Sequence, residues 1–411
     1  MSQILELFLG IMTALGGFVD IGELVFAISA GAHFGYLLLW VVVLATIGIA
    51  LFSEMSGRMA AVLKKPTFEI VRDHYGFGRG LAVLIASNLV NVLTCAAEVG
   101  GVALLLQILL PWDLRLMLLA AALVLLVSTF VLKFKWIERV YGLLGLMLLV
   151  YGVAAWQLDP DWDAALKGLI PHAPEPGMPD WKMYGYYMVG LFSSILMPYE
   201  IYFYSSGGIE DKWTPKDLPI NKITAGVGFT LGGALVCALI MVGAALFLPA
   251  QVVPQRLSAT IFGASIPLGA PGFWLALAGI FFAVSGAAVE TALSAGYNVA
   301  QFFGIKWGKR LKPQEVPLFT VFWMAAIVIG LAISLSGANP VDIVEFSVIF
   351  AVVVLPLTYY PVLKLANDPK RMGEHVNSPI IRVLGWIYFG LIVLAALAAI
   401  PLMIATRMGQ G

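Results

Sequence analysis

The first apolar stretch of the chain is interrupted by Gly16-Gly17-Phe18-Val19-Asp20-Ile21-Gly22-Glu23, which places two carboxylates where a membrane helix is otherwise apolar. An ionisable group at membrane depth is energetically costly, so its default interpretation is an ion or substrate pathway. A second interruption, Ile195-Leu196-Met197-Pro198-Tyr199-Glu200, lies in the other half of the chain. Two broken helices in corresponding positions of two halves indicate the binding site of a transporter.

The composition is that of a membrane protein. Of the 411 residues, 61% are hydrophobic and 12% are charged. Apolar runs of about 20 residues predict membrane-spanning helices, and we expect an all-α polytopic protein with eleven of them. The predicted spans are residues 5–30, 34–56, 81–109, 115–133, 138–157, 184–206, 223–249, 271–303, 317–336, 341–365 and 382–406.

The distribution of Lys and Arg predicts the orientation. Most of the 24 basic residues follow even-numbered spans, so the positive-inside rule predicts a cytoplasmic N-terminus and an outside C-terminus in the plasma (inner) membrane.

The start of the chain has no positive charge and no small-residue cleavage pattern, so we expect no cleaved signal peptide. The net charge is zero, which gives no electrostatic case for a nucleic-acid partner. The expected partners are the lipid bilayer and a transported ion, without an obligate protein partner.

We expect one transmembrane transporter domain over residues 1–411. A Pro- and Asp-rich outside loop at about 158–183 divides it into a first repeat at about 5–157 and a second at about 184–366, and an extra helix follows at about 382–406. Five spans is an odd number, so the second repeat has inverted topology. Broken first and sixth spans in such an arrangement are typical of the LeuT-type inverted 5+5 repeat.

The carboxylates of Asp20, Glu23 and Glu200 and the thioether of Met197 are the predicted core of the site. Negative charges in a low dielectric repel unless they are protonated or neutralised, and neither broken span contains Lys, Arg or His. A bound divalent cation would neutralise them; the alternative is that they are protonated, hydrogen-bonded packing groups. The soft sulfur favours transition metals, whereas the oxygens favour Mg²⁺, Mn²⁺ or Ca²⁺, so the ion stays open.

Three further acids lie within or near the predicted spans, and each has two alternative roles, as a relay for the transported ion or for protons, or as a structural group. Glu98 and Glu290 lie within the third and eighth spans, and Glu54 lies near the end of the second. Cys95 and Cys237 are expected to pack rather than to form a disulfide or bind metal. All four histidines fall outside the predicted spans, so we expect no imidazole inside the membrane.

Three stretches resemble a known family. Asp20-Ile21-Gly22-Glu23 stands where that family has Asp-Pro-Gly-Asn, the nine residues from Met197 to Ser205 are similar to its Met-Pro-His-Asn-Leu-Tyr-Leu-His-Ser, and Ala97-Glu98-Val99 matches its third-span Ala-Glu-Val. The chain thus resembles a divergent branch of the NRAMP family of divalent metal-ion transporters. This resemblance implies a LeuT-type fold and alternating access. It also implies a metal site with Asp20 and Met197 as ligands, and backbone carbonyls near Val19 and Ser194.

The departures from the family pattern concern the ion site and the proton route. The resemblance places Glu23 at the family's Asn ligand and Val348 at its tenth-span Gln. It places Cys95 at the third-span Asp of the proton route, and Tyr199 and Tyr204 at two sixth-span histidines. Loss of proton-route residues also marks the NRAMP-related magnesium transporters, although the retained Met197 is unlike that subgroup.

We therefore expect a transporter that moves divalent metal cations, Mn²⁺, Mg²⁺ or a related ion, by alternating access without obligatory proton coupling. The alternative is a secondary transporter of a small organic substrate such as an amine or amino acid, for which Phe18, Tyr199 and Tyr202 could supply cation–π contacts. A third possibility is a membrane sensor or scaffold. No enzyme motif occurs, and the metal is expected as substrate rather than as a permanently bound cofactor.

Overall fold

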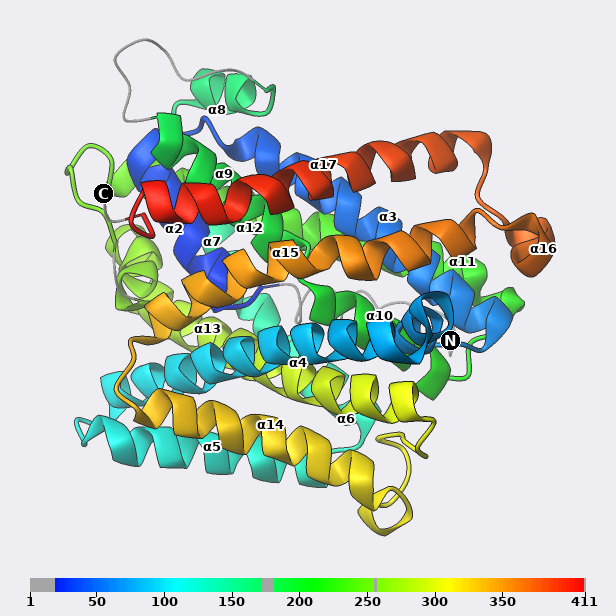
Figure 1. Cartoon of the computed structure of the whole chain (residues 1–411). Helices are drawn as coiled ribbons and strands as arrows, with labels where there is room; N and C mark the ends of the chain where they lie inside the picture. The colour runs from blue at the N-terminus through cyan, green and yellow to red at the C-terminus, as the bar shows by residue number, and fades with distance from the viewer. Residues whose placement is uncertain (1–18, 172–180, 255–256, 410–411) are drawn as a thin grey trace.

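The computed structural model describes residues 19–171, 181–254 and 257–409, and these residues form a bundle of helices without strands (Figure 1). The α-helices of this part of the chain are α2 (Ile21–Phe34), α3 (Leu39–Leu63), α4 (Thr67–Leu109), α5 (Leu114–Val131), α6 (Phe134–Gly145), α7 (Val150–Gln157), α8 (Trp162–Gly168), α9 (Trp181–Ile195), α10 (Pro198–Glu210), α11 (Leu218–Ile223), α12 (Phe229–Leu246), α13 (Leu257–Phe303), α14 (Pro317–Leu335), α15 (Pro340–Ala366), α16 (Pro369–Met372) and α17 (Pro379–Ala405).

Nine helical segments of the described residues are long and apolar enough to cross a membrane. The described part of the predicted first span lies in the short helix α2, and the predicted sixth span is divided between α9 and α10. The count of eleven therefore stays a prediction. The prediction that the fold is all-α and polytopic is confirmed. The division into repeats over residues 5–157 and 184–366 also stays a prediction.

Two predicted spans began too late. α4 starts at Thr67 rather than at 81, and α13 starts at Leu257 rather than at 271. Each helix continues through a kink, at Gly76 (φ 74°) in α4 and at Gly269 (φ 64°) in α13. The first turns of α4 are polar and give no hydropathy signal, whereas Pro267, Gly269 and Pro271 interrupt the apolar sequence of α13.

The predicted outside loop at 158–183 is partly helical. Its described part contains α8, which lies outside the main bundle at the top of Figure 1. Asp161 caps this helix, because its side chain accepts a hydrogen bond of 2.9 Å from the backbone N–H of Ala164. A Cβ atom at Gly168 would lie 2.2 Å from the carbonyl oxygen of Tyr36, so α8 packs closely on the chain between α2 and α3.

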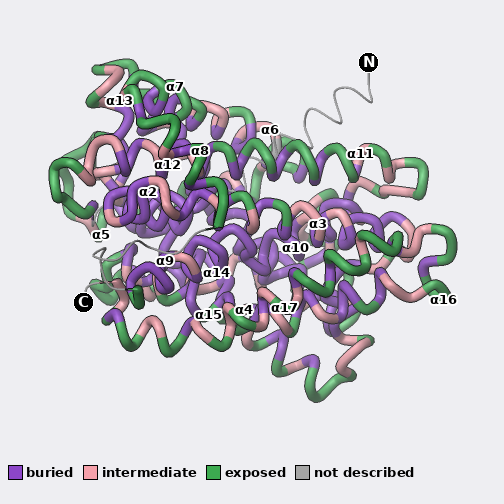
Figure 2. Tube along the Cα trace, turned by 90° about the horizontal axis from the view of Figure 1, so that it is seen from above, coloured by how far each residue is buried: buried purple, intermediate pink, exposed green. Residues whose placement is uncertain are grey.

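α4 and α13 form the centre of the bundle and pack against each other. α15 and α14 pack on α4, α2 packs on α12 and α9, and α10 packs on α3 and α13. Figure 2 shows α10 buried among its neighbours. α17 is the least buried of the nine segments and crosses the bundle on its outside, against α15 and α9 (Figure 1).

The contact between α2 and α12 depends on two glycines. A Cβ atom at Gly31 would lie 2.1 Å from the carbonyl oxygen of Ile240, and one at Gly243 would lie 2.4 Å from that of Ile28. Small residues let helix backbones approach closely in membranes. This crossing holds α2, and with it Asp20 and Glu23 at the start of the helix, in place.

We predict that Gly31→Ala destabilises the protein, because the new methyl group meets backbone atoms that cannot rotate away. Overpacking of this kind costs roughly 1–3 kcal/mol. Gly390→Ala in α17 is the matched control, since a Cβ atom there meets nothing within 4 Å. Thermal unfolding of the detergent-solubilised protein should show a lower Tm for Gly31→Ala only. Equal Tm values for the two variants would contradict the close crossing.

Candidate functional site

The interruption in the first span is the N-terminus of α2. Asp20 has an extended backbone (φ −97°, ψ −176°) and caps the helix. Its Oδ1 atom accepts hydrogen bonds from the backbone N–H groups of Gly22 (2.5 Å) and Glu23 (3.3 Å). The Oε2 atom of Glu23 accepts from the backbone N–H of Asp20 at 2.9 Å. The two carboxylates therefore form a capping box.

A third carboxylate reaches the same helix end from α4. The Oε1 atom of Glu98 accepts from the backbone N–H of Ile21 at 3.1 Å. Four successive N–H groups, from residue 20 to residue 23, thus donate to three carboxylates. The side chains of Asp20, Glu23 and Glu98 are 0% exposed. The positive end of the helix dipole helps to stabilise this negative charge.

Each of the three carboxylates has one oxygen that receives no hydrogen bond from the start of α2. Among the described residues, Glu23 Oε1 and Glu98 Oε2 have no hydrogen-bond partner. The remaining oxygen of Asp20, Oδ2, accepts from the hydroxyl of Tyr199 at 3.2 Å. Of the salt bridges between residues that the structure describes, none includes Asp20, Glu23 or Glu98. Buried carboxylates without a basic partner are stabilised by a bound cation.

Gly22 lies in the first turn of α2, and the break precedes it at Val19 and Asp20. A Cβ atom at this position would lie 2.8 Å from Asp20 Oδ1 and 3.2 Å from the side chain of Val348 in α15. Gly22 therefore makes room for the capping carboxylate and for α15.

The interruption in the sixth span separates α9 from α10. α9 ends at Ile195 and α10 begins at Pro198, where the missing N–H of proline is tolerated because the first turn of a helix has no acceptor for it. The carbonyl oxygen of Leu196, exposed by the break, accepts from the hydroxyl of Tyr359 at 3.0 Å. Glu200 lies in the first turn of α10. Both of its carboxylate oxygens are buried and have no hydrogen-bond partner among the described residues.

The other predicted ligands border the two breaks. Val19 is buried directly before Asp20. Ser194 is buried in the last turn of α9, where its hydroxyl donates to the carbonyl oxygen of Leu191 at 3.2 Å. Met197 precedes α10 and is buried in an apolar cluster with Val90, Tyr199, Ala351 and Val354.

The four acids of this region influence one another electrostatically. Glu23 interacts with Asp20 and Glu200, and Glu98 interacts with Asp20. The part of the chain that the structure describes nevertheless contains no group of three acidic, His or Cys side chains placed to hold one metal ion. The assignment of Asp20, Glu23 and Glu200 as common ligands therefore stays a prediction.

Of the predicted secondary residues, Glu54 and Tyr204 belong to another network. The Glu54 carboxylate pairs with Arg58 at 3.0 Å, one helical turn away in α3. Tyr204 donates to the side-chain oxygen of Asn221 at 2.9 Å, and the Asn221 amide donates to the backbone carbonyl of Glu54 at 2.9 Å. Arg58 also donates to the side chain of Asn377 at 2.5 Å. This network ties α3, α10 and α11 to the loop before α17.

Cys95 and Glu290 lie closer to the acids. Cys95 is buried in α4 one turn before Glu98, with its sulfur 3.8 Å from the carbonyl oxygen of Ala288 in α13. Glu290 is a buried residue of α13 that interacts electrostatically with Glu200 and Tyr199. Cys95 and Cys237 are free thiols, as expected.

Two histidines that lie outside the predicted spans belong to helices, His33 to α2 and His74 to α4. His33 lies in the last turn of α2, half-buried between Phe34 and Tyr187, because α2 continues past the predicted end of the span at residue 30. Sequence reasoning also missed the N-cap role of Asp20. The spacing of Asp20 and Glu23, an acceptor followed three residues later by Glu, is a capping-box signature that could have revealed it.

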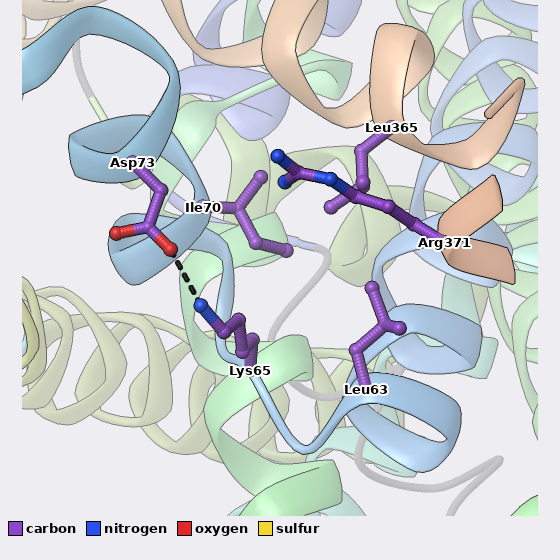
Figure 3. A pocket seen from close by; sticks show the side chains of 6 residues that line it. All are labelled: Leu63, Lys65, Ile70, Asp73, Leu365 and Arg371. Atoms are coloured by element: carbon purple, nitrogen blue, oxygen red, sulfur yellow. Dashed lines mark hydrogen bonds and ion pairs between the residues drawn. The ribbon is translucent and has the colours of Figure 1, made fainter.

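A pocket of about 340 Å³ lies apart from these acids, where α3 ends, α4 begins and α15 ends (Figure 3). Lys65 and Asp73 face each other across it at 2.5 Å. Leu63, Ile70, Leu365 and Arg371 complete the lining. The Lys65 ammonium group lies outside the spans, and its hydrogen bond to Asp73 raises its pKa. This ion pair leaves little unpaired charge for a ligand of this pocket.

Relatives in sequence cover most of the chain. A divalent metal cation transporter MntH from Levilactobacillus brevis is 26% identical over 396 residues, which cover 90% of this chain and 83% of that protein. A protein of the same description from Listeria innocua is 26% identical over 387 residues, which cover 90% of this chain and 84% of that one.

Solved structures show the same fold. The manganese transporter of Eremococcus coleocola superposes with a TM-score of 0.75 at 19% identity, covering 98% of this chain and 87% of that one. Mhp1, a nucleobase-cation-symport-1 family transporter, superposes with a TM-score of 0.58 at 12% identity, covering 97% of this chain and 91% of that one. The prediction of a LeuT-type fold is confirmed.

The family model described as natural resistance-associated macrophage protein-like (Nramp) matches residues 10–401. Because this match includes both breaks and nearly the whole chain, the protein belongs to the Nramp family.

Proposed function

We propose that this protein carries divalent metal cations across the membrane by alternating access. The observation that carries the proposal is the start of α2, where three fully buried carboxylates converge without a basic partner among the described residues. The relatives described as divalent metal cation transporters and the fold shared with a manganese transporter support the same activity. The protein is a transporter rather than an enzyme.

The proposed ligands come from both breaks. Asp20 and Glu23 supply carboxylate oxygens, Met197 supplies its sulfur, and the backbone carbonyls near Val19 and Ser194 complete the set. Glu98 positions the start of α2 through its hydrogen bond to Ile21. Because these groups lie on α2, α4, α9 and α10, a movement of one helix pair past the other would open the ion to one side of the membrane at a time.

The donor types leave two candidate ions. Carboxylate oxygens suit Mg²⁺ and Mn²⁺ alike, whereas the thioether of Met197 favours a softer transition metal. We place the cation as the transported substrate and assign no permanently bound cofactor. We also propose that the protein lies in the plasma (inner) membrane with its N-terminus in the cytoplasm, as the positions of Lys and Arg favour.

We further propose that transport needs no obligatory proton coupling. Tyr199, at the position of a family histidine, donates a hydrogen bond from its hydroxyl to Asp20. Cys95, at the position of a family aspartate, is buried against α13. Neither group exchanges a proton readily near neutral pH, since the ordinary pKa values of Tyr and Cys lie well above 7.

We predict that purified protein in liposomes takes up Mn²⁺, Mg²⁺ or both. A fluorescent reporter inside the liposomes measures uptake, and empty liposomes are the control. If no divalent ion enters faster than in empty liposomes, the proposed function is wrong. Thermal stabilisation by an amine but by no metal ion would then favour the organic substrate.

We predict that Asp20→Asn and Glu23→Gln each weaken Mn²⁺ binding at least tenfold, a loss of about 1.4 kcal/mol. Each substitution keeps an oxygen that can accept the capping hydrogen bonds but removes a negative charge. Glu374→Gln, which changes an exposed carboxylate between α16 and α17, is the matched control. Calorimetry on the three variants tests the assignment, and unchanged affinity in both Asp20→Asn and Glu23→Gln would refute it.

A separate measurement tests proton coupling. With a pH-sensitive dye inside the same liposomes, we expect ion uptake without acidification of the interior. We also expect that an imposed pH gradient does not drive uptake against an ion gradient. Acidification in a constant ratio to the ions taken up would show that a proton route exists.

A further inference from the structure

Glu200 and Glu290 are two membrane acids that the start of α2 does not use. Glu200 belongs to the first turn of α10, and Glu290 belongs to α13. These two helices pack together, and the hydroxyl of Ser294 in α13 donates to the carbonyl oxygen of Tyr199 at 3.2 Å. Glu290 therefore lies one helical turn along α13 from the point where that helix contacts the residue before Glu200.

Neither carboxylate is satisfied by the protein. Both oxygens of Glu200 are buried without a hydrogen-bond partner among the described residues. Glu290 makes no hydrogen bond or ion pair with any residue that the structure describes, and its side chain is 8% exposed. A buried carboxylate without partners is energetically costly unless it is protonated or neutralised by a cation.

Glu200 connects Glu290 electrostatically with the acids at the start of α2. It interacts with Glu290 on one side and with Asp20 and Glu23 on the other. No three acids of the described chain could hold one ion together. Glu200 and Glu290 are thus connected to the start of α2 by charge but do not share a single coordination site with it.

Exposure orders the acids along a path. Asp20 and Glu23 are 0% exposed, Glu200 is 5% exposed and Glu290 is 8% exposed. The exposed fraction thus increases from the start of α2 through Glu200 to Glu290. An ion that leaves the start of α2 in this order would pass Glu200 and then Glu290.

We propose that Glu200 and Glu290 form a second divalent-cation site between α10 and α13, through which the transported ion passes on its way to or from Asp20 and Glu23. The proposal rests on the function proposed above. Asp20, Glu23, Glu98, Glu200 and Glu290 together carry five negative charges when ionised, and two divalent cations balance four of them. The second site holds the ion less tightly, because its carboxylates are less deeply buried and electrostatic interactions weaken as the local dielectric rises.

Counting bound Mn²⁺ tests this proposal. Free Mn²⁺ gives a sharp electron paramagnetic resonance signal, so titration of the detergent-solubilised protein yields the number of bound ions. We expect two ions per wild-type chain, one tight and one at least tenfold weaker. Glu290→Gln should lose the weaker ion and keep the tight one, whereas Asp20→Asn should lose the tight one.

Two further variants keep the result interpretable. Glu290→Asp retains the charge and should retain the second ion, and Glu374→Gln, at an exposed carboxylate, should bind as the wild type does. Saturation of the wild type at one ion, or two ions bound by Glu290→Gln, would overturn the second site while leaving the proposed function intact. A wild-type protein that binds no Mn²⁺ and transports no divalent ion would overturn both.

Discussion

The hydrogen bonds between the exposed N–H groups of α2 and the carboxylates of Asp20, Glu23 and Glu98 are the interaction on which the site depends. A helix that begins inside a membrane leaves donors that water cannot reach, and each unpaired donor is costly. Here acids rather than neutral groups satisfy them. The same contacts that allow the break therefore concentrate negative charge at one buried point.

Hydrogen bonds connect the proposed ion site to the helices whose movement would open it. Glu98 attaches the start of α2 to α4, and Tyr199 attaches Asp20 to α10. Farther along α2, the close crossing at Gly31 and Gly243 attaches the helix to α12. A displacement of α10 would change the Tyr199 contact first, so the charge around Asp20 responds directly to the position of the second broken helix.

Much of the fold could be predicted from the sequence, because long apolar runs indicate membrane helices and proline indicates where a helix begins or is interrupted. The sequence predicts an interruption at residues 195–200, and α10 begins within it at Pro198. It also predicts the interruption around Asp20, but only the structure shows that Gly22 makes room for Val348. The contact between Glu98 and Ile21 joins residues far apart in sequence, and no local pattern reveals it. The pairing of Glu54 with Arg58 can be predicted from the sequence, because opposite charges four residues apart on one helix lie side by side.

The central claim is that the unused oxygens of the capping carboxylates hold the transported cation. Anomalous diffraction from crystals soaked in Mn²⁺ tests it most directly, because the peak gives the position of the ion without any assumption about its ligands. The account predicts a peak within about 2–2.6 Å of oxygens of Asp20 and Glu23, the usual range for oxygen ligands of divalent cations. A fully occupied peak elsewhere in the membrane region, with both carboxylates bound only to the backbone of α2, would contradict it.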